Sequence, residues 1–246
     1  MKRILISGGN GKFAQSIVKQ RGENIVFAPP KSRMDITRLE DIESAIEIYR
    51  PNIFLHSAAY TRPMKKHQAH PDISIENNIM GVCNVVLACM KHNIKLVYIS
   101  TDYVYPGVDG GYNEDSALSP FISNQSDGVA KYGWSKLGGE CAVRMCDNSL
   151  ILRVCMCDHP FPHDHALVDV KKSLMYNFEA AKTTLKLLDK TGVINIGGKA
   201  QTVYDFAKTE NPNIKKISRL DIEDVDIAPD TTMNISKLKE ILNDKT

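Results

Sequence analysis

Short apolar runs recur along the chain, and each is followed by Gly, Pro or small polar residues. Runs of this kind, without alternation of polar and apolar positions, are typical of parallel strands that are buried on both faces. Segments with helical spacing of apolar residues lie between them. The pattern predicts an α/β fold, a doubly wound parallel sheet, with strands near residues 3–7, 24–28, 52–56, 95–99 and 149–154.

The segments between the predicted strands carry helix signals. Thr37 and Glu40 have the spacing of a capping box, which predicts a helix through Tyr49 that Pro51 stops. Another helix is expected from Tyr132 through Cys146. Residues 72–92 are expected to form one long helix whose apolar residues are spaced for burial: Ile75, Ile79, Val82, Val86 and Met90.

Composition and charge narrow the class of partner. Thirty-one basic and 29 acidic residues give a net charge of +2, so no strong field is directed at nucleic acid or a membrane surface. Ser7 ends the first apolar run too early for a signal peptide, and no later run approaches a membrane span. The six cysteines have no Cys-x-x-Cys spacing, which indicates reduced thiols. We expect a cytoplasmic protein with a small-molecule partner.

A glycine-rich stretch, Gly8-Gly9-Asn10-Gly11-Lys12-Phe13-Ala14, directly follows the first strand and opens a helix. Small residues there allow a tight turn and leave free amide groups at a helix N-terminus, pointed at a pyrophosphate. Such a motif alone is a weak signal. The strand before it and the helix after it favour a Rossmann-type dinucleotide site over an ordinary glycine turn.

The end of the second strand indicates which dinucleotide binds. An acidic residue there would bind the adenosine ribose of NAD, but the chain reads Ala28-Pro29-Pro30-Lys31-Ser32-Arg33. Lys31 and Arg33 suit a 2′-phosphate, so NADP(H) is favoured and NAD(H) stays an alternative. Two solvated loop charges are the simpler explanation of the same residues.

Small and polar residues follow the third and fourth strands. Ser57-Ala58-Ala59-Tyr60-Thr61 would let a flat ring lie close to the backbone. Ser100-Thr101-Asp102-Tyr103 reaches the carboxyl edge of the sheet, where ligands bind in open parallel sheets. Asn78 falls inside the long helix and, if buried, needs either a structural backbone contact or an active-site water as its partner.

Tyr132 and Lys136 lie one helical turn apart on the same face of a helix. A phenol becomes a usable acid near neutrality only if a nearby positive charge stabilises the phenolate, and Lys136 would supply that charge. The spacing alone decides nothing, because Tyr204 and Lys208 repeat it. Tyr132 is favoured because it follows the strand that ends in Ser100 and Thr101.

Six motifs fall in the order that extended short-chain dehydrogenase/reductases have. The closest similarity is to dTDP-4-dehydrorhamnose reductases, which reduce the 4-keto group of a nucleotide-linked 6-deoxyhexose with NADPH. The resemblance covers residues 1–157 and thins beyond them. The motifs are Gly8-x-x-Gly11-x-x-Ala14, His56-Ser57-Ala58-Ala59-Tyr60-Thr61, Asn78-x-x-Gly81-x-x-Asn84, Ser100-Thr101-Asp102-Tyr103-Val104-Tyr105, Tyr132-Gly133-x-Ser135-Lys136-Leu137-x-Gly139-Glu140 and Leu152-Arg153-Val154.

This resemblance implies roles for the residues. Thr101 would hydrogen-bond the substrate carbonyl, Tyr132 would donate the proton, and Lys136 would hold the nicotinamide ribose. The substrate contacts would be Thr101, Asp102 and Tyr103, and no metal is expected. The cofactor-binding residues would be Gly8, Gly9, Asn10, Gly11, Lys12, Phe13, Ala14, Lys31, Arg33, Asp35, Ile36, Ser57, Ala58, Ala59, Tyr60, Asn78, Ser100, Tyr132, Lys136 and Val154.

The resemblance also implies two domains. Residues 1–157 would bind the dinucleotide, and residues 158–246 would form a reduced substrate domain, with parts around 176–196 packing back on the sheet. The segment between Val154 and Tyr176 is shorter than in relatives, where it carries substrate-binding and dimer elements. The sugar and a homodimer therefore stay open. The loop Phe121 to Val129 looks longer than in relatives.

Two other functions stay open. A bifunctional 3,5-epimerase/4-reductase would need an additional acid/base pair, for which Cys155 and His163 are candidates. A non-catalytic NADP-binding regulatory relative would keep the fold and act as a binding partner. The shortened substrate segment favours the regulatory protein, whereas intact Thr101, Tyr132 and Lys136 favour the enzyme.

Residues that ligate metals crowd one short segment after the fifth strand. Their spacing matches no zinc pattern, and prolines and aromatic residues interrupt it. A sugar or phosphate contact, or a plain loop, explains the segment better than a metal site does. The residues are Cys155, Cys157, Asp158, His159, His163, Asp164 and His165.

Overall fold

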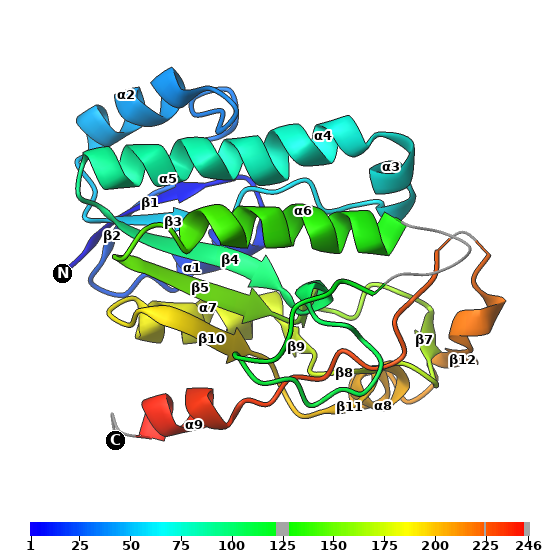
Figure 1. Ribbon diagram of the computed structural model, residues 1–246. Helices are drawn as coiled ribbons and strands as arrows, with labels where there is room; N and C mark the ends of the chain where they lie inside the picture. The colour runs from blue at the N-terminus through cyan, green and yellow to red at the C-terminus, as the bar shows by residue number, and fades with distance from the viewer. Residues whose placement is uncertain (122–127, 224, 244–246) are drawn as a thin grey trace.

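The computed structural model describes residues 1–121, 128–223 and 225–243. Within these residues, a six-stranded sheet with the order β10-β5-β4-β3-β1-β2 runs through the molecule (Figure 1). Every neighbouring pair in it is parallel, so the predicted doubly wound parallel sheet is confirmed. Its strands are β1 (Arg3–Ser7), β2 (Ile25–Phe27), β3 (Ile53–His56), β4 (Lys95–Thr101), β5 (Ser149–Val154) and β10 (Gly192–Ile196).

Helices cover both faces of this sheet. Figure 1 shows α2 (Leu39–Tyr49), α5 (Gly81–Lys91) and α6 (Gly128–Val143) on one side, and α1 (Lys12–Lys19) and α7 (Asn177–Leu187) on the other. Alternate residues of a strand point to opposite faces. Ile4 and Ile6 accordingly pack in the core with α1 and α7, whereas Leu5 packs in the core with α2 and α5.

The five predicted strands all form, with small differences at their ends. The second is shorter than expected, because only Ile25–Phe27 pairs with β1. The fourth continues to Thr101, which pairs with Val154 of β5. The strands that were predicted from buried apolar runs are therefore the elements that build the centre of the sheet.

The predicted single helix over residues 72–92 is instead three helical pieces. α4 (Pro71–Ile75) leads into a π-helical turn, η1 (Glu76–Met80), and α5 follows. A π-turn inserts an extra residue and changes which side chains face inward. In η1 this turns Asn78 inward and leaves Met80 57% exposed.

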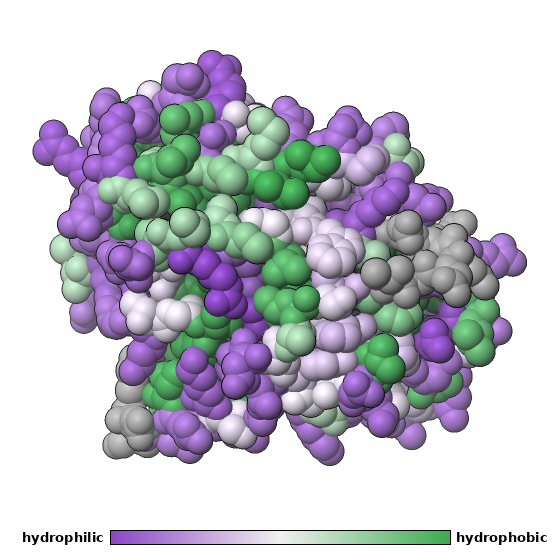
Figure 2. Space-filling view, viewed as in Figure 1, coloured by the Kyte–Doolittle hydropathy of each residue, from purple (hydrophilic) through white to green (hydrophobic). Residues whose placement is uncertain are grey.

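The predicted buried face of this run was also wrong in part. Val82 and Val86 are buried, but Ile75 and Met90 are about half exposed, at 49% and 53%. Steps of four residues drift off one face, because an α-helix has 3.6 residues per turn. Figure 2 shows apolar side chains exposed over this region.

By length and composition, Pro71–Lys91 is apolar enough to cross a membrane, contrary to the expectation from sequence. It packs on α6 and the sheet, however, as a core helix does.

The predicted capping box does not form. The helix α2 begins at Leu39, and its N-cap residue, Arg38, makes no side-chain cap. The Thr37 hydroxyl donates instead to Asp35 Oδ1, at 2.9 Å. Two acidic residues in the first turn, Glu40 and Asp41, suit the positive end of the helix dipole.

Most of the remaining elements surround the carboxyl end of the sheet, whereas α9 (Ser236–Asn243) packs beside β10 (Figure 1). α7 packs on α1 and β10 pairs with β5, although both come from beyond residue 157; the division into two domains at that residue stays a prediction. Most of the predicted long loop at 121–129 lies outside the described residues. The other elements are α3 (Met64–Ala69), η2 (Asp102–Val104), β6 (Met156–Cys157), β7 (His165–Leu167), β8 (Lys171–Lys172), β9 (Met175–Tyr176), β11 (Gln201–Thr202), α8 (Val203–Lys208), β12 (Lys215–Ile217), η3 (Arg219–Asp221) and α9 (Ser236–Asn243).

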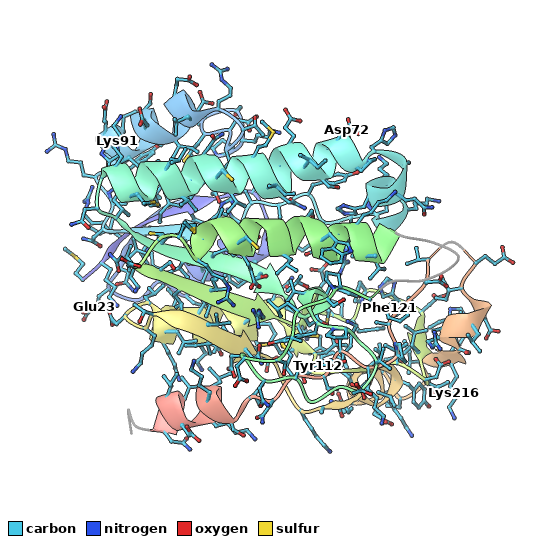
Figure 3. All side chains as sticks on the ribbon, viewed as in Figure 1. Glu23, Asp72, Lys91, Tyr112, Phe121 and Lys216 are labelled. Carbon is cyan, nitrogen blue, oxygen red and sulfur yellow. The ribbon has the colours of Figure 1, made fainter. Side chains whose placement is uncertain are left out.

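A buried polar network lies beneath the site, between α6, β5 and the loop that carries Tyr112. Arg153 and Glu140 form a bidentate ion pair with both side chains at 0% exposure. The Tyr105 hydroxyl accepts from Arg153 Nη1 at 2.8 Å, and its ring stacks on Tyr112, which is labelled in Figure 3. Ser100 donates to Glu140 Oε1 at 2.6 Å. A fully paired network of this kind fixes the strand ends that carry the site.

Candidate active site

A cavity of about 800 Å³ opens at the carboxyl ends of β1, β3, β4 and β5. This is the side of an open parallel sheet where ligands bind. The walls come from the glycine turn after β1, from the segments that follow the other three strands, and from residues of the C-terminal third of the chain. The cavity therefore joins a nucleotide-type turn to the segment that was expected to contact a sugar.

The glycine turn has the geometry of a phosphate cradle. Gly8 has φ +72, a conformation that favours glycine, and a Cβ atom there would lie 2.9 Å from the Cα of Ala58. A Cβ atom on Gly9 would lie 2.1 Å from the carbonyl oxygen of Ala28. The helix α1 that follows has no side-chain cap at Gly11. Its first amide groups are thus available to an anion, and the predicted dinucleotide fits this end of the cavity.

Most of the predicted cofactor and substrate residues line this cavity. Three do not: Gly9, which packs behind the turn against Ala28, Arg33, which is exposed, and Asn78, which is buried away from it. Those that line the cavity are Gly8, Asn10, Gly11, Lys12, Phe13, Ala14, Lys31, Asp35, Ile36, Ser57, Ala58, Ala59, Tyr60, Ser100, Thr101, Asp102, Tyr103, Tyr132, Lys136 and Val154.

Only one of the two cations expected for a 2′-phosphate reaches the cavity wall. Lys31 lines the cavity, and its Nζ lies 3.3 Å from Asp35 Oδ2. Residues 28–33, which follow β2, contain no carboxylate, but Asp35 places one at the cavity wall. A carboxylate there can accept ribose hydroxyls, and a lysine can bind a phosphate.

Asn78 positions two walls of the cavity rather than lining it. Its amide oxygen accepts from Tyr60 N at 2.7 Å, and its amide nitrogen donates to Tyr60 O and to Ser135 Oγ. Of the two predicted partners, the structural backbone contact is the one that forms. This single side chain fastens the segment after β3 to helix α6.

The three predicted catalytic side chains meet at the centre of the cavity. Tyr132 and Lys136 face it from α6, and Thr101 faces it from the end of β4. Close packing brings α6 this near, because a Cβ atom on Gly133 would lie 2.5 Å from the carbonyl oxygen of Tyr103. Tyr103 packs edge-on against Tyr132, with ring centroids 5.9 Å apart.

The ionisation of this pair differs from the prediction. Burial lowers the pKa of Lys136 to about 7, against the opposing effect of Glu140. The Lys136 Nζ donates to the Ile99 carbonyl at 2.8 Å and lies 4.2 Å from the centre of the Tyr98 ring. Burial and then the Asp102 carboxylate raise the pKa of Tyr132, and hydrogen bonding with Thr101 only partly offsets them. Burial and Asp102 therefore outweigh the expected lowering of the Tyr132 pKa.

Asp102 lines the cavity, but its carboxylate is already engaged. Oδ1 accepts from the Thr101 hydroxyl at 3.1 Å, and Oδ2 accepts from Lys172 at 2.7 Å and from Thr231 at 2.6 Å. Sequence reasoning missed Lys172 and Thr231. They lie 70 and 129 residues from Asp102, and no local pattern marks either one.

The crowded segment after β5 divides between the cavity and the surface. Cys155, Cys157, Asp158 and His163 line the cavity. Asp158 accepts from Lys12 at 2.5 Å and from Asn177 at 2.6 Å, which ties the glycine turn to the far wall. Among the described residues, no group of three His, Cys, Asp or Glu side chains is placed to hold a metal ion.

Comparison with protein families gives the decisive match, since residues 1–157 fit the RmlD substrate binding domain. The chain belongs to the RmlD substrate binding domain family. The match ends at Cys157, so it includes every predicted catalytic residue. Lys172 and Thr231 lie beyond the residues that match the RmlD family.

Curated relatives of this RmlD-family chain include both an enzyme and a subunit of a larger assembly. A dTDP-4-dehydrorhamnose reductase of Aggregatibacter actinomycetemcomitans is 32% identical over 160 residues, which are 62% of this chain and 51% of that protein. The methionine adenosyltransferase 2 subunit beta of Xenopus laevis is 27% identical over 163 residues, 62% of this chain and 46% of that protein. The matched region thus spans about half the length of these relatives.

A solved structure extends the likeness to the whole fold. The dTDP-4-dehydrorhamnose reductase of Bacillus anthracis str. Ames, in complex with NADP, has a TM-score of 0.84 and 23% identity. The alignment covers 98% of this chain and 91% of that one. The C-terminal third therefore follows the same fold, beyond the residues that match the RmlD family.

Proposed function

We propose that the protein is an NADPH-dependent reductase of the 4-keto group of a nucleotide-linked 6-deoxyhexose, with dTDP or UDP as the nucleotide. The observation that carries this proposal is the convergence of Thr101, Tyr132 and Lys136 on a cavity that the glycine turn also lines. A relative that is 32% identical bears the name dTDP-4-dehydrorhamnose reductase. Cytoplasmic location and homodimer formation stay predictions.

The residues suit a hydride transfer to a carbonyl. NADPH bound at the glycine turn would supply the hydride. Reduction of a carbonyl leaves an alkoxide, a much stronger base than any group present at neutral pH, so a proton must arrive as the charge forms. Tyr132 donates that proton, and its raised pKa keeps the phenol protonated in readiness. Lys136 would hold the nicotinamide ribose, and its charge would stabilise the phenolate.

Thr101 would hydrogen-bond the substrate carbonyl beside Tyr132. A hydroxyl has one proton to donate, so Thr101 can donate either to Asp102 Oδ1 or towards Tyr132 and the carbonyl.

The contacts of Cys155 give little support to the epimerase alternative. An epimerase needs a base that removes a proton from carbon. Burial and then the Asp102 carboxylate raise the pKa of the Cys155 thiol well above its ordinary range. A thiol that holds its proton so tightly is a poor base. His163 lines the cavity and stays a candidate for this base.

The regulatory alternative has two points in its favour. A subunit of methionine adenosyltransferase 2 matches the same part of the chain, and the segment between Val154 and Tyr176 is short. On this alternative the protein binds NADP(H) and contacts another protein. Turnover of a nucleotide-sugar distinguishes the two functions, because only the reductase would show it.

A panel of dTDP- and UDP-linked 4-keto-6-deoxyhexoses with NADPH tests the proposal. Loss of NADPH absorbance is followed for the parent protein and for Tyr132→Phe. We expect turnover of at least one sugar by the parent, lowered about 10²–10⁴-fold in the variant. NADPH binding without turnover of any sugar would reject the reductase and favour the regulatory protein.

A further inference from the structure

Lys172 is a buried cation that lines the same cavity as the catalytic side chains. Its Nζ donates to Asp102 Oδ2 at 2.7 Å and to Thr231 Oγ1 at 3.0 Å, and it lies 4.0 Å from the centre of the Tyr103 ring. β8 carries Lys172, and this strand pairs with β11. The ammonium is thus fixed by contacts from two separate segments, residues 102–103 and Thr231.

The contacts of Lys172 reach the catalytic hydroxyls through one carboxylate. Asp102 accepts from Lys172 and Thr231 on Oδ2 and from Thr101 on Oδ1. The Thr101 hydroxyl has one proton, and its direction depends on the orientation in which Asp102 Oδ1 is held to accept that proton. Thr101 in turn hydrogen-bonds Tyr132.

The charge of Lys172 also matters to Tyr132. An unpaired buried carboxylate would repel the alkoxide that forms when the carbonyl is reduced. Burial lowers the pKa of Lys172, but Asp102, Tyr103 and Cys155 together raise it by more, so the side chain stays charged. The pair of Lys172 and Asp102 therefore presents no net charge to the reacting atoms.

We propose that Lys172 is a positioning residue of the reduction: it orients Asp102, which directs the Thr101 hydroxyl, and it neutralises the carboxylate beside Tyr132. The inference rests on the proposed reductase function. Lys172 acts through Asp102 and is not assigned a contact with the substrate. It lies in the part of the chain beyond the family match.

Lys172→Met tests the proposal, and Lys171→Met is its matched control. Lys171 is the neighbouring residue of β8, but its side chain is 62% exposed and lies 4.0 Å from Asp230. We expect Lys172→Met to lower kcat about 10²-fold, with the Kd for NADPH unchanged within about twofold because the glycine turn is untouched. Lys171→Met should keep the parent kcat.

A double variant separates positioning from general damage to the fold. In Asp102→Asn with Lys172→Met, the buried charges disappear together, and the Asn oxygen can still accept the Thr101 proton. We expect kcat to recover about tenfold relative to Lys172→Met alone. A double variant that is no better than the single one would overturn the proposal.

Thr231→Val keeps the test decisive if Lys172→Met does not fold. It removes one donor to Asp102 without removing a charge, and we expect kcat to fall about tenfold with the Kd for NADPH kept. An unchanged kcat in Lys172→Met, or in Thr231→Val when only that variant folds, overturns the role of Lys172 but leaves the reductase standing. A parent protein that reduces no sugar of the panel overturns both.

Discussion

The ionisation of Lys136 makes the binding of NADP(H) a proton-coupled event. In the free protein, burial lowers the pKa of Lys136 from 10.5 to about 7. At pH 8 the side chain is then only about one-tenth protonated. If the bound ribose and the phenol of Tyr132 require the ammonium form, the complex holds a proton that the free protein lacks. Binding at pH 8 should therefore take up about 0.9 proton.

The sign of the effect on affinity follows directly. Above pH 7 the free protein must acquire a proton in order to bind, so the association constant falls as the pH rises. The fall should approach tenfold per pH unit between about pH 8 and 9. Below pH 7 Lys136 is already charged, and this dependence should disappear. The 2′-phosphate does not contribute at pH 8, because its last pKa lies near 6.

Isothermal titration calorimetry measures this uptake. The binding enthalpy of NADP⁺ at pH 8 is measured in two buffers, and the two values differ by the number of protons exchanged multiplied by the difference in ionisation enthalpy of the buffers. Lys136→Met should bind more weakly and exchange almost none. Lys31→Ala is the control, since it alters another cation of the cavity and should keep the uptake. Zero uptake by the parent, or equal uptake by Lys136→Met, would refute the reasoning.

Three further predictions concern other parts of the molecule. Tyr132→Phe should lose about 10²–10⁴-fold in kcat in a steady-state assay while Tyr204→Phe, with the same spacing to a lysine, keeps it; equal losses would reject the assignment. Lys31→Ala should raise the Kd for NADPH relative to NADH in fluorescence titrations, whereas Arg33→Ala, outside the cavity, should not; a change with Arg33 alone would contradict the structure. Arg153→Met leaves a buried carboxylate unpaired and should cost about 3–5 kcal/mol in the free energy of unfolding, measured by urea denaturation; a loss below about 1 kcal/mol would contradict this account.

The parts of the fold that could be predicted from the sequence are those that depend on residues close together in the chain. Five buried apolar runs gave five strands of the central sheet, and the small residues around Gly8 gave the turn, because burial and backbone freedom leave a mark at each position. The placement of Tyr132 and Lys136 on one face of a helix needed only the periodicity of that helix. These features depend on residues that are neighbours in the sequence.

The features that escaped prediction depend on distant contacts or on a small change of backbone geometry. One π-turn redirected Asn78 from the cavity to the Tyr60 backbone, and no propensity marks such a turn. Lys171 and Lys172 look like two equal surface charges, and only pairing of β8 with β11 makes one exposed and the other buried. The ionisation of Lys136 was misjudged because it follows from burial, which spacing does not reveal.

The contacts at the site join segments that lie far apart in the sequence, and this has a consequence for the order of folding. Residues up to 157 include all three proposed catalytic side chains. One neighbour of β5 in the sheet, however, is β10, at Gly192–Ile196, and Asp102 is held by Thr231. A chain emerging during synthesis would thus carry its reactive groups long before the segments that hold them in place. Competence for the reaction would arise as a late step, when the last third docks.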